Sequence, residues 1–385
     1  MITIVDFHWS FILPSLLSAA VAMTPTAQAR PSDAPIEAAA PPLTPAAMCP
    51  ALAPQVTETR VLRVLQTVEL TEVPAGAERV RLWVPVPGDG PWQRVLGRRV
   101  VEAPAGWQLV RQPGMGGDLA YVEAPASGGP VKVVVESLVR REAPAVDVAA
   151  PTPAAMLEAP LQKQLFVDAL RADATNMLVD DKVRALAKSA VAGERDPRRK
   201  VVKLLQATAD AADHYSKDPS KPHCGRGSAQ DCMENGGGCC TDLHSLFIAM
   251  ARAEGIPARL QMGYRLKPEQ EGKSYDPSYR CWVEYWLDGS GWVPTDIVVA
   301  DGGDSAARAA HWGRLDAKRV WLWEGRGFDL LPKQAAPPIQ TMLCGWAEVD
   351  GKPVDVLPAA DGTPSKLRRT IVFEDLTDEY AAARQ

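Results

Sequence analysis

The sequence has no excess of basic residues and no long apolar run after its first 30 residues, and each absence excludes a class of protein. Its 385 residues contain 42 Lys and Arg against 47 Asp and Glu, a net charge of −5, and the basic residues are scattered. Nucleic acids and anionic membrane surfaces bind clusters of positive charge, so we expect neither as a partner. A membrane-spanning helix needs roughly 20 apolar residues. We therefore expect no membrane span in the mature chain.

The first ten residues, MITIVDFHWS, contain no Lys or Arg, although the residues after them have the form of an export signal. Residues 11–23 are apolar, and the tripeptide AQA at 27–29 has the small-x-small pattern of a cleavage site. We predict a signal peptide over residues 1–29 and a periplasmic or extracellular protein. Residues 30–56 are rich in Ala and Pro, cannot form a core, and are predicted to be a linker.

The chain has seven cysteines but lacks a zinc-binding spacing. The gaps between Cys224, Cys232 and Cys239 are seven and six residues, and no C-x-x-C pattern occurs. We therefore expect no metal site and no cofactor. Three disulfides with one free thiol, or a set of unpaired buried thiols, are both compatible with this count.

Residues 57–145 contain no His and no Cys, and their pattern is that of strands. Polar and apolar residues alternate over Arg79–Val84, and Val133–Val135 is a continuous apolar run suited to a buried strand. Turns rich in Gly and Pro separate these segments at short intervals. We predict a small antiparallel β-sandwich over residues 57–145, with no catalytic groups.

Residues 146–160 are again rich in Ala and Pro and are predicted to be a second linker, after which helical patterns begin. Lys182–Val191 and Arg198–Ala212 each place apolar residues on one face, and an amphipathic helix runs from Cys240 to Gly255. Strands are predicted at Ala258–Tyr264, Cys281–Leu287 and Trp292–Val299. Helices followed by an antiparallel sheet define an α+β fold.

Cys240 lies at the predicted start of the amphipathic helix, where a thiol is expected to be reactive. The positive end of the helix dipole and the free N–H groups favour a thiolate and can hold an oxyanion. Gly238 allows another segment to approach closely, and Asp242 is placed to cap the first turn. Cys240 is therefore a candidate nucleophile, with Gly238 and Cys239 as the surrounding oxyanion loop. A structural thiol, or half of a disulfide, is the alternative.

The segment GCCTDLHSLFIAMARAEGIPAR, residues 238–259, resembles the nucleophile helix of bacterial transglutaminase-like proteins, which are related to papain-type cysteine peptidases. The strand QMGY, the segment YRCWVEYWLDGSGWVPTDIVVAD and residues 311–340 and 346–354 resemble later parts of the same family. The segment RVRLWVPVP resembles the N-terminal sandwich of some members. The resemblance implies an α+β protein with a papain-like transglutaminase-type core over residues 161–355. Residues 356–385 would then be a C-terminal tail with a peripheral strand and a short helix.

The triad of this family is Cys, His and Asp, and its positions fall at Cys240, Arg280 and Asp296. Arg280 therefore occupies the histidine position. A neutral imidazole accepts the proton of the nucleophile and returns it to the leaving amine, whereas a guanidinium stays charged and has no acceptor. Arg280 can still favour a Cys240 thiolate by its charge, and it can pair with Asp296.

Other residues of the motif are expected to support the site. His244 lies one helical turn after the candidate nucleophile, but the resemblance implies a place beside the base and not the base itself. Trp282 and Trp292 are expected to pack near the site. Cys281 follows Arg280 in a strand, so alternation directs it to the opposite face, as a buried thiol or bridge partner. The spacing of His214, His223 and His311 gives no support for a substitute base.

The substitution at the histidine position leads to three functional hypotheses. The first is an exported transglutaminase-like protein with a degenerate Cys-Arg-Asp site that binds, or acts weakly on, peptide or protein ligands. The second is an active cysteine peptidase, amidase or acyltransferase that uses Cys240 with a non-standard base. The third is a structural envelope protein that interacts through its sandwich.

Overall fold

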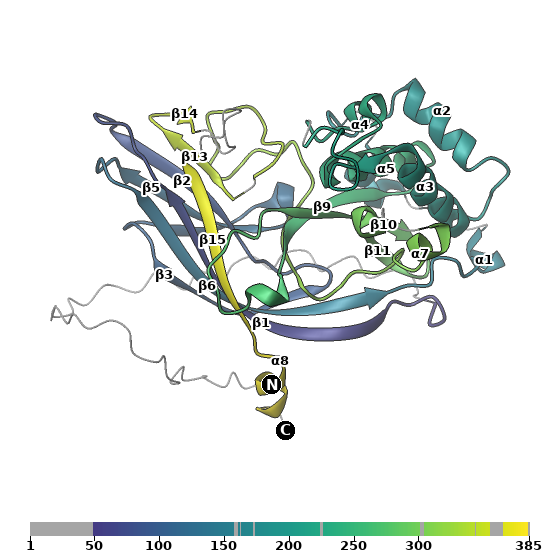
Figure 1. Cartoon of the computed structure of the whole chain (residues 1–385), viewed down its shortest axis with the longest axis horizontal. Coiled ribbons are helices and arrows are strands. Elements are labelled where there is room, and N and C mark those ends of the chain that lie inside the picture. The colour runs from purple at the N-terminus through teal and green to yellow at the C-terminus, as the bar shows by residue number, and fades with distance from the viewer. Residues whose placement is uncertain are drawn as a thin grey trace. The chain divides into compact units, whose positions relative to one another are not determined.

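A computed structural model of the chain describes residues 49–157, 161, 163–171, 174–223, 226–300, 304–342, 344–354 and 365–383. The predicted signal peptide, most of the first predicted linker, and Cys224 lie outside the described residues. The described residues all belong to a single unit, Pro45–Gln385 (Figure 1).

One sheet of a sandwich is built on two long strands. β1 (Gln55–Leu70) and β6 (Val131–Ala145) pair antiparallel along almost their whole length. β3 (Gln93–Glu102) adds to β6, and β15 (Leu367–Asp375) adds to β1, which gives the order β15-β1-β6-β3. Burial alternates along β1 from Leu62 to Leu70, as the period-two pattern of a half-buried strand requires.

The second sheet of the sandwich has the order β14-β13-β2-β5-β4. Its strands are β2 (Arg79–Val86), β4 (Gln108–Arg111), β5 (Asp118–Pro125), β13 (Trp346–Val349) and β14 (Lys352–Pro353). Between the two sheets lies a core of branched apolar side chains that includes Val68, Leu82, Val122 and Val133. The predicted sandwich is therefore present.

The strands that complete the sandwich come from the far end of the chain. β13 pairs with β2, although the sequence division assigned residues 346–354 to the transglutaminase-type core. β15 pairs with β1, so the predicted peripheral strand of the tail is an integral edge of the sheet. Val146 and Val148, within the predicted second linker, are buried in the core. Pairing between distant segments leaves no local pattern, so sequence periodicity did not reveal these additions.

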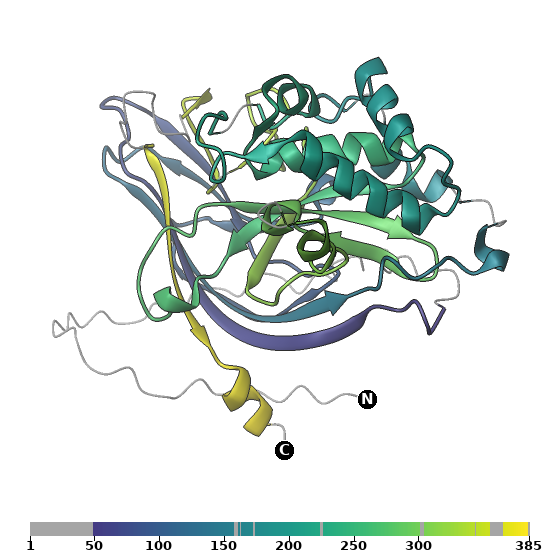
Figure 2. The same cartoon turned by 45° about the vertical axis from the view of Figure 1, so that its right-hand side comes forward.

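A second, helical layer covers a four-stranded antiparallel sheet with the order β11-β10-β9-β12 (Figure 2). The strands are β9 (Ala258–Arg265), β10 (Arg280–Leu287), β11 (Gly291–Thr295) and β12 (Arg319–Glu324). The main helices are α2 (Asp181–Ala190), α3 (Pro197–Ala211), α4 (Ala229–Asn235) and α5 (Cys240–Ala253). The expected α+β class, with helices packed on an antiparallel sheet, is confirmed.

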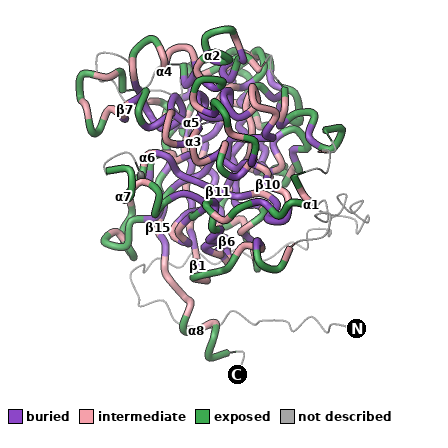
Figure 3. Tube along the Cα trace, turned by 90° about the vertical axis from the view of Figure 1, so that its right-hand side faces the viewer, coloured by how far each residue is buried: buried purple, intermediate pink, exposed green. Residues whose placement is uncertain are grey.

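Helix α5 is the centre of this layer. Every residue from Cys240 to Ala251 is buried, and the helix contacts α2, α3, α4 and the strands β9 and β10 (Figure 3). Gly263 permits the close approach of β9 and β12, because a Cβ there would lie 1.9 Å from the carbonyl oxygen of Val320. β9, which also contacts α5, is therefore packed closely against β12.

Short elements connect these layers. They are α1 (Ala154–Leu157), α6 (Ile297–Ala300), α7 (Ser305–Ala309), α8 (Thr377–Ala382), β7 (Asp213–His214) and β8 (Gly237–Gly238). Single 3₁₀ turns lie at Pro113–Met115, Lys163–Phe166, Asp168–Leu170 and Pro268–Gln270. Among the described residues, no helix combines the length and apolar character needed to cross a bilayer.

Candidate active site

Helix α5 begins at Cys240, as predicted, and the carboxylate of Asp242 holds its first turn in place. Asp242 accepts hydrogen bonds from the backbone N–H of Cys239 and from that of Ser228, both at 3.0 Å. Ser228 in turn caps α4 through its hydroxyl. Asp242 therefore ties the starts of α4 and α5 together, and it is 1% exposed.

The glycines before Cys240 bring a third segment to the site. Gly237 and Gly238 form β8, which pairs in parallel with Asp213 and His214 of β7. A Cβ at Gly238 would lie 2.6 Å from the Asp242 carboxylate, so this position accepts only glycine. His214, whose spacing gave no sign of a role, is thereby brought beside the loop of the candidate nucleophile.

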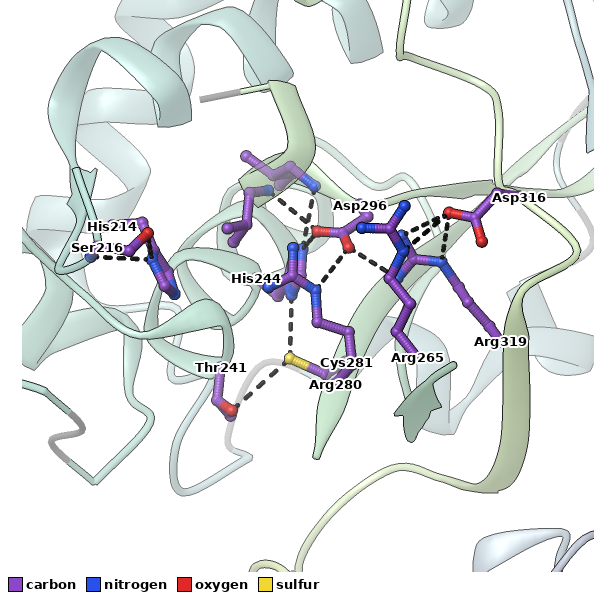
Figure 4. Close-up of polar contacts among 12 residues, drawn as sticks. His214, Ser216, Thr241, His244, Arg265, Arg280, Cys281, Asp296, Asp316 and Arg319 are labelled. Carbon is purple, nitrogen blue, oxygen red and sulfur yellow. Dashed lines mark hydrogen bonds and ion pairs between the residues drawn. The ribbon is translucent and has the colours of Figure 1, made fainter. Parts of the chain in front are cut away.

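Asp296 is the electrostatic centre of the site (Figure 4). Its Oδ2 accepts a hydrogen bond from Arg280 Nε at 2.9 Å and another from Arg319 Nη1 at 2.7 Å. Burial alone would raise the pKa of Asp296, but the charges of Arg280 and Arg319 hold it well below its usual range. The carboxylate is therefore ionised, with Oδ2 bonded to both guanidinium groups and Oδ1 accepting the Val298 N–H at 3.1 Å.

Arg319 is the site residue that the sequence reasoning missed. It is 1% exposed, pairs with Asp316 as well as with Asp296, and lies 5.8 Å from the ring of Trp282. The one available signal was an Arg at the start of the apolar strand RVWLWE, because a charged residue at the start of a buried strand needs a buried partner.

His244 is completely buried between α5, β10 and α6. Its Nδ1 lies 3.1 Å from Cys281 Sγ, and its Nε2 accepts a hydrogen bond from the Ile297 N–H at 3.1 Å. The Nε2 also lies 3.6 Å from Asp296 Oδ1. Because Nε2 is an acceptor, the ring proton is on Nδ1 and points to Cys281. Burial lowers the pKa of His244, so the ring is neutral.

Cys240 is 5% exposed, and its environment differs from the sequence expectation. Its interaction with Cys239 lowers the pKa of the Cys240 thiol, but the neighbouring Cys281 and burial together raise it far above the ordinary value. The expected lowering by the helix N-terminus is therefore outweighed, because the thiol is removed from water and lies against another thiol.

Cys281 lies opposite Arg280 across the strand, as alternation predicted, but it faces α5 and thereby joins the site. Its sulfur contacts His244 and lies 3.6 Å from Thr241 Oγ1. Cys239 Sγ lies 3.3 Å from the Tyr279 hydroxyl. Among the described cysteines, Cys49, Cys232, Cys240, Cys281 and Cys344 are free thiols. In the described part of the chain, no three His, Cys, Asp or Glu side chains are arranged to hold a metal ion.

The two motif tryptophans pack at different places. Trp282 is buried with Leu315 and Trp321 next to Arg319. Trp292 is half-buried under the guanidinium of Arg259, which lies 4.0 Å from its ring centroid. Trp282 therefore supports the carboxylate end of the site, whereas Trp292 stabilises the far end of the sheet.

His214 contributes a second buried imidazole. Its Nδ1 lies 2.7 Å from Ser216 Oγ. Burial, followed by the charge of Arg280, lowers the pKa of His214 to about 4. His214 is therefore neutral near pH 7. A cavity of about 350 Å³ with a mixed polar and apolar lining contacts Asp296 and Arg319.

A thiol at the start of a buried helix, packed against an antiparallel sheet that supplies a carboxylate, defines the papain-like class of cysteine-dependent acyl-transfer folds. Residues 184–297 match the family model of the Transglutaminase-like superfamily, and the chain therefore contains a transglutaminase-like domain.

Two individual proteins are similar to this chain over part or most of its length. An uncharacterized protein of Haemophilus influenzae is 31% identical over 172 residues, which cover 37% of this chain and 47% of that protein. The chain thus spans about half the length of this curated relative. The crystal structure of a candidate cysteine protease from Cytophaga hutchinsonii has a TM-score of 0.50 at 14% identity, over 83% of this chain and 100% of that one. This likeness shows a shared fold.

A further solved structure is more distant. The periplasmic domain of TgpA from Pseudomonas aeruginosa has a TM-score of 0.30 at 17% identity, over 61% of this chain and 92% of that domain.

Proposed function

We propose that this chain is an exported transglutaminase-like protein that has lost amide-bond chemistry at its Cys240-Arg280-Asp296 site and binds polypeptide ligands. The observation that carries the proposal is the ion pair between Arg280 and Asp296 at the family's imidazole position. Export is inferred from the N-terminal apolar run and the AQA tripeptide.

The chemistry of amide cleavage supports the loss of activity. The leaving amine must receive a proton. Arg280 remains charged, so it can neither accept the proton of Cys240 nor give a proton to the amine. Asp296 holds Arg280 in this form, and Cys240 is a buried thiol whose pKa is raised. Removal of one member of a catalytic triad lowers turnover by about 10⁴-fold or more.

A narrower activity is the second candidate. Thioesters and activated esters release leaving groups that need little protonation, so attack by Cys240 alone suffices for them. The charge of Arg280 supports this candidate, because it favours the thiolate form of Cys240 although it cannot supply a proton to a leaving amine. Acylation of Cys240 by such donors would be compatible with loss of amide chemistry.

The test is Cys240-dependent turnover of a glutamine-containing peptide with a fluorescent amine, and of a peptide amide with water. We expect none in the natural chain, and a gain of at least tenfold over background in Arg280→His, which is abolished in Arg280→His/Cys240→Ala. Turnover by the natural chain that Cys240→Ala abolishes would refute the proposal.

Ligand binding is measured separately, by fluorescence anisotropy of labelled casein peptides. We expect saturable binding that Cys240→Ala retains, since binding does not need the thiol. Binding that never saturates would contradict the proposal that the protein binds polypeptides. The proposed loss of amide-bond activity would still be tested by the turnover assay.

A further inference from the structure

The cavity of about 350 Å³ next to Asp296 lies where strands β1 and β6 of the sandwich meet the loop before β12. It is partly open to solvent, and its wall combines the exposed side chains of His311 and Arg314 with Arg319, which is 1% exposed. A cavity of this volume accommodates a small organic molecule and is larger than one inorganic ion requires. Cys240 is not part of the wall, so a ligand held there does not need the thiol.

The carboxylates in the wall of this cavity are already paired with arginines. They are Glu58, bonded to Arg60, Asp296, bonded to Arg280 and Arg319, and Asp316, paired with Arg319 and Arg265 (Figure 4). The charges of Arg265 and Arg319 are therefore balanced within the wall. A ligand with an acidic group meets carboxylates whose charge is largely compensated, so their repulsion of a single negative charge is weak.

Arg314 is the cation of the wall that is left over. Within the part of the chain that the structure describes, its side chain forms neither an ion pair nor a hydrogen bond. Its backbone is fixed by a bridge to Ala145, so the guanidinium extends from a defined point of the wall. The ring of His311, three residues earlier, has no side-chain partner in the same described residues. A guanidinium with free N–H donors is suited to bind a carboxylate through two hydrogen bonds.

Arg141 supplies a second, independent sign of a missing anion. It is 2% exposed, and its Nε and Nη2 lack a hydrogen-bond partner among the described residues. Alternation along β6 places Arg141 on the same face as Ala143, which lines the cavity, and its charge acts on Arg319 and Asp316 of the wall. Burial, and then the charge of Arg319, lower the pKa of Arg141 to about 10. A buried cation without a partner is unfavourable, so an anion in the cavity would stabilise it.

We propose that this cavity binds a small organic carboxylate, whose charged end pairs with Arg314 and whose apolar body packs against Val299, Leu315 and Pro144. A single negative charge fits better than a phosphate, because the carboxylates of the wall repel a second charge. A free organic acid and the C-terminal residue of a polypeptide share this chemistry. The inference goes beyond the proposed function and does not depend on the chemistry of Cys240.

The first experiment titrates the full chain by isothermal calorimetry with N-acetyl-leucine, N-acetyl-leucinamide, isocaproate and inorganic phosphate at constant ionic strength. We expect saturable binding of at least one of the two acids and none of the amide, which has the same shape without the charge. Tighter binding of N-acetyl-leucine than of isocaproate would identify a polypeptide C-terminus as the source, and the reverse order a free acid. Equal binding of the amide, tighter binding of phosphate, or no saturable binding of either acid at millimolar concentration would overturn the proposal.

The second experiment repeats the titration with Arg314→Gln, which removes an exposed charge and leaves the core untouched. We expect the dissociation constant of the acid to rise at least about threefold, since an exposed charge-assisted pair is lost. The matched control is Arg184→Gln, at an exposed arginine of α2 that does not line the cavity. An unchanged affinity in Arg314→Gln would overturn the assignment.

The third experiment uses Arg141→Met, which keeps the length of the side chain and removes its charge. We expect weaker binding of the acid, with a midpoint of urea unfolding without ligand that does not fall, because the lost cation has no partner. A lower midpoint with unchanged affinity would show that Arg141 has only a structural role.

Binding in Cys240→Ala separates this inference from the proposed function. We expect Cys240→Ala to bind the acid as the natural chain does, since Cys240 is not part of the wall. Loss of binding in this variant would overturn the assignment to the cavity. Amide turnover by the natural chain would refute the proposed function and leave the binding result intact.

Discussion

The Asp296 carboxylate pairs with two guanidinium groups, those of Arg280 and Arg319. Replacing one of them should change the stability of the protein by a predictable amount. Arg280→Met removes one of the two cations but leaves the bond from Arg319, 2.7 Å long. Asp296 thus loses one cationic partner and keeps the other, so we expect the free energy of unfolding to fall by about 1–3 kcal/mol. Urea denaturation checks this value. Arg280→Lys, which keeps the charge, is the matched control, and a loss as large as in Arg280→Met would show that charge is not the cause.

His214 makes the stability depend on pH. Its pKa is about 4 in the folded chain because burial, and then Arg280, disfavour the imidazolium, whereas an unfolded histidine titrates near 6.5. The unfolded state therefore binds more protons between these values, so the stability present above pH 6.5 is lost as pH falls toward 4. The slope from one such group is at most about 1.4 kcal/mol per pH unit.

Urea unfolding at several pH values tests this dependence. We expect His214→Gln to reduce the slope between pH 6.5 and 4 without removing it, because His244 acts in the same direction. The same substitution at exposed His311 is the control. An unchanged slope in His214→Gln would contradict the role given to burial.

At this scale the sequence predicted part of the site. The motif gave the positions of Cys240, Arg280 and Asp296, and the expected pairing of Arg280 with Asp296 is observed. The partner Arg319 was not predicted, since its strand lies 23 residues beyond Asp296. The sequence predicted a lowered pKa for Cys240, and this was wrong, because burial in the tertiary fold and the neighbouring Cys281 raise it more than the helix dipole lowers it.

At the scale of elements, the start of α5 depends on one carboxylate. Asp242→Ala leaves the backbone N–H groups of Cys239 and Ser228 without their acceptor in a buried place. Each unsatisfied buried donor costs about 1–3 kcal/mol, so we expect the two together to lower the free energy of unfolding by roughly 2–6 kcal/mol. Asp242→Asn retains one oxygen and should lose less. Equal losses in the two variants, measured by thermal or urea unfolding, would point to charge as the dominant factor.

Local periodicity predicted most elements near the site. The helices expected at Lys182–Val191 and Arg198–Ala212 are present as α2 and α3, displaced by one residue. β9 and β10 agree with their predictions within one residue. The strand expected to reach Val299 ends at Thr295, because the turn at Asp296 starts α6. The apolar run IVV is equally compatible with a strand and with a short buried helix, so the sequence alone does not predict which of the two forms.

At the scale of the whole unit, β15 closes the edge of the sandwich. Ile371 and Phe373 are buried against the core, and β15 pairs with β1 from Leu62 to Leu70. Deletion of residues 365–385 should expose that edge and lower the unfolding midpoint, with concentration-dependent association through the open strand. Light scattering and urea unfolding measure both effects. Deletion of residues 377–385 alone, which removes only α8, is the control and should leave the molecule monodisperse.

Both sheets of the sandwich contain strands from opposite ends of the polypeptide, and this affects how the chain is made. β1 and β2 are synthesised first. Strand β15, which pairs with β1, and strand β13, which pairs with β2, emerge only near the end of translation. At about 5–20 residues per second, β1 waits tens of seconds for its last neighbour. The helices and sheet around Cys240 are complete before then, so they are expected to fold first. Premature termination after β12 but before residue 367 would yield a chain that contains the helices and sheet around Cys240 and an unprotected β-edge, a product prone to aggregation and proteolysis.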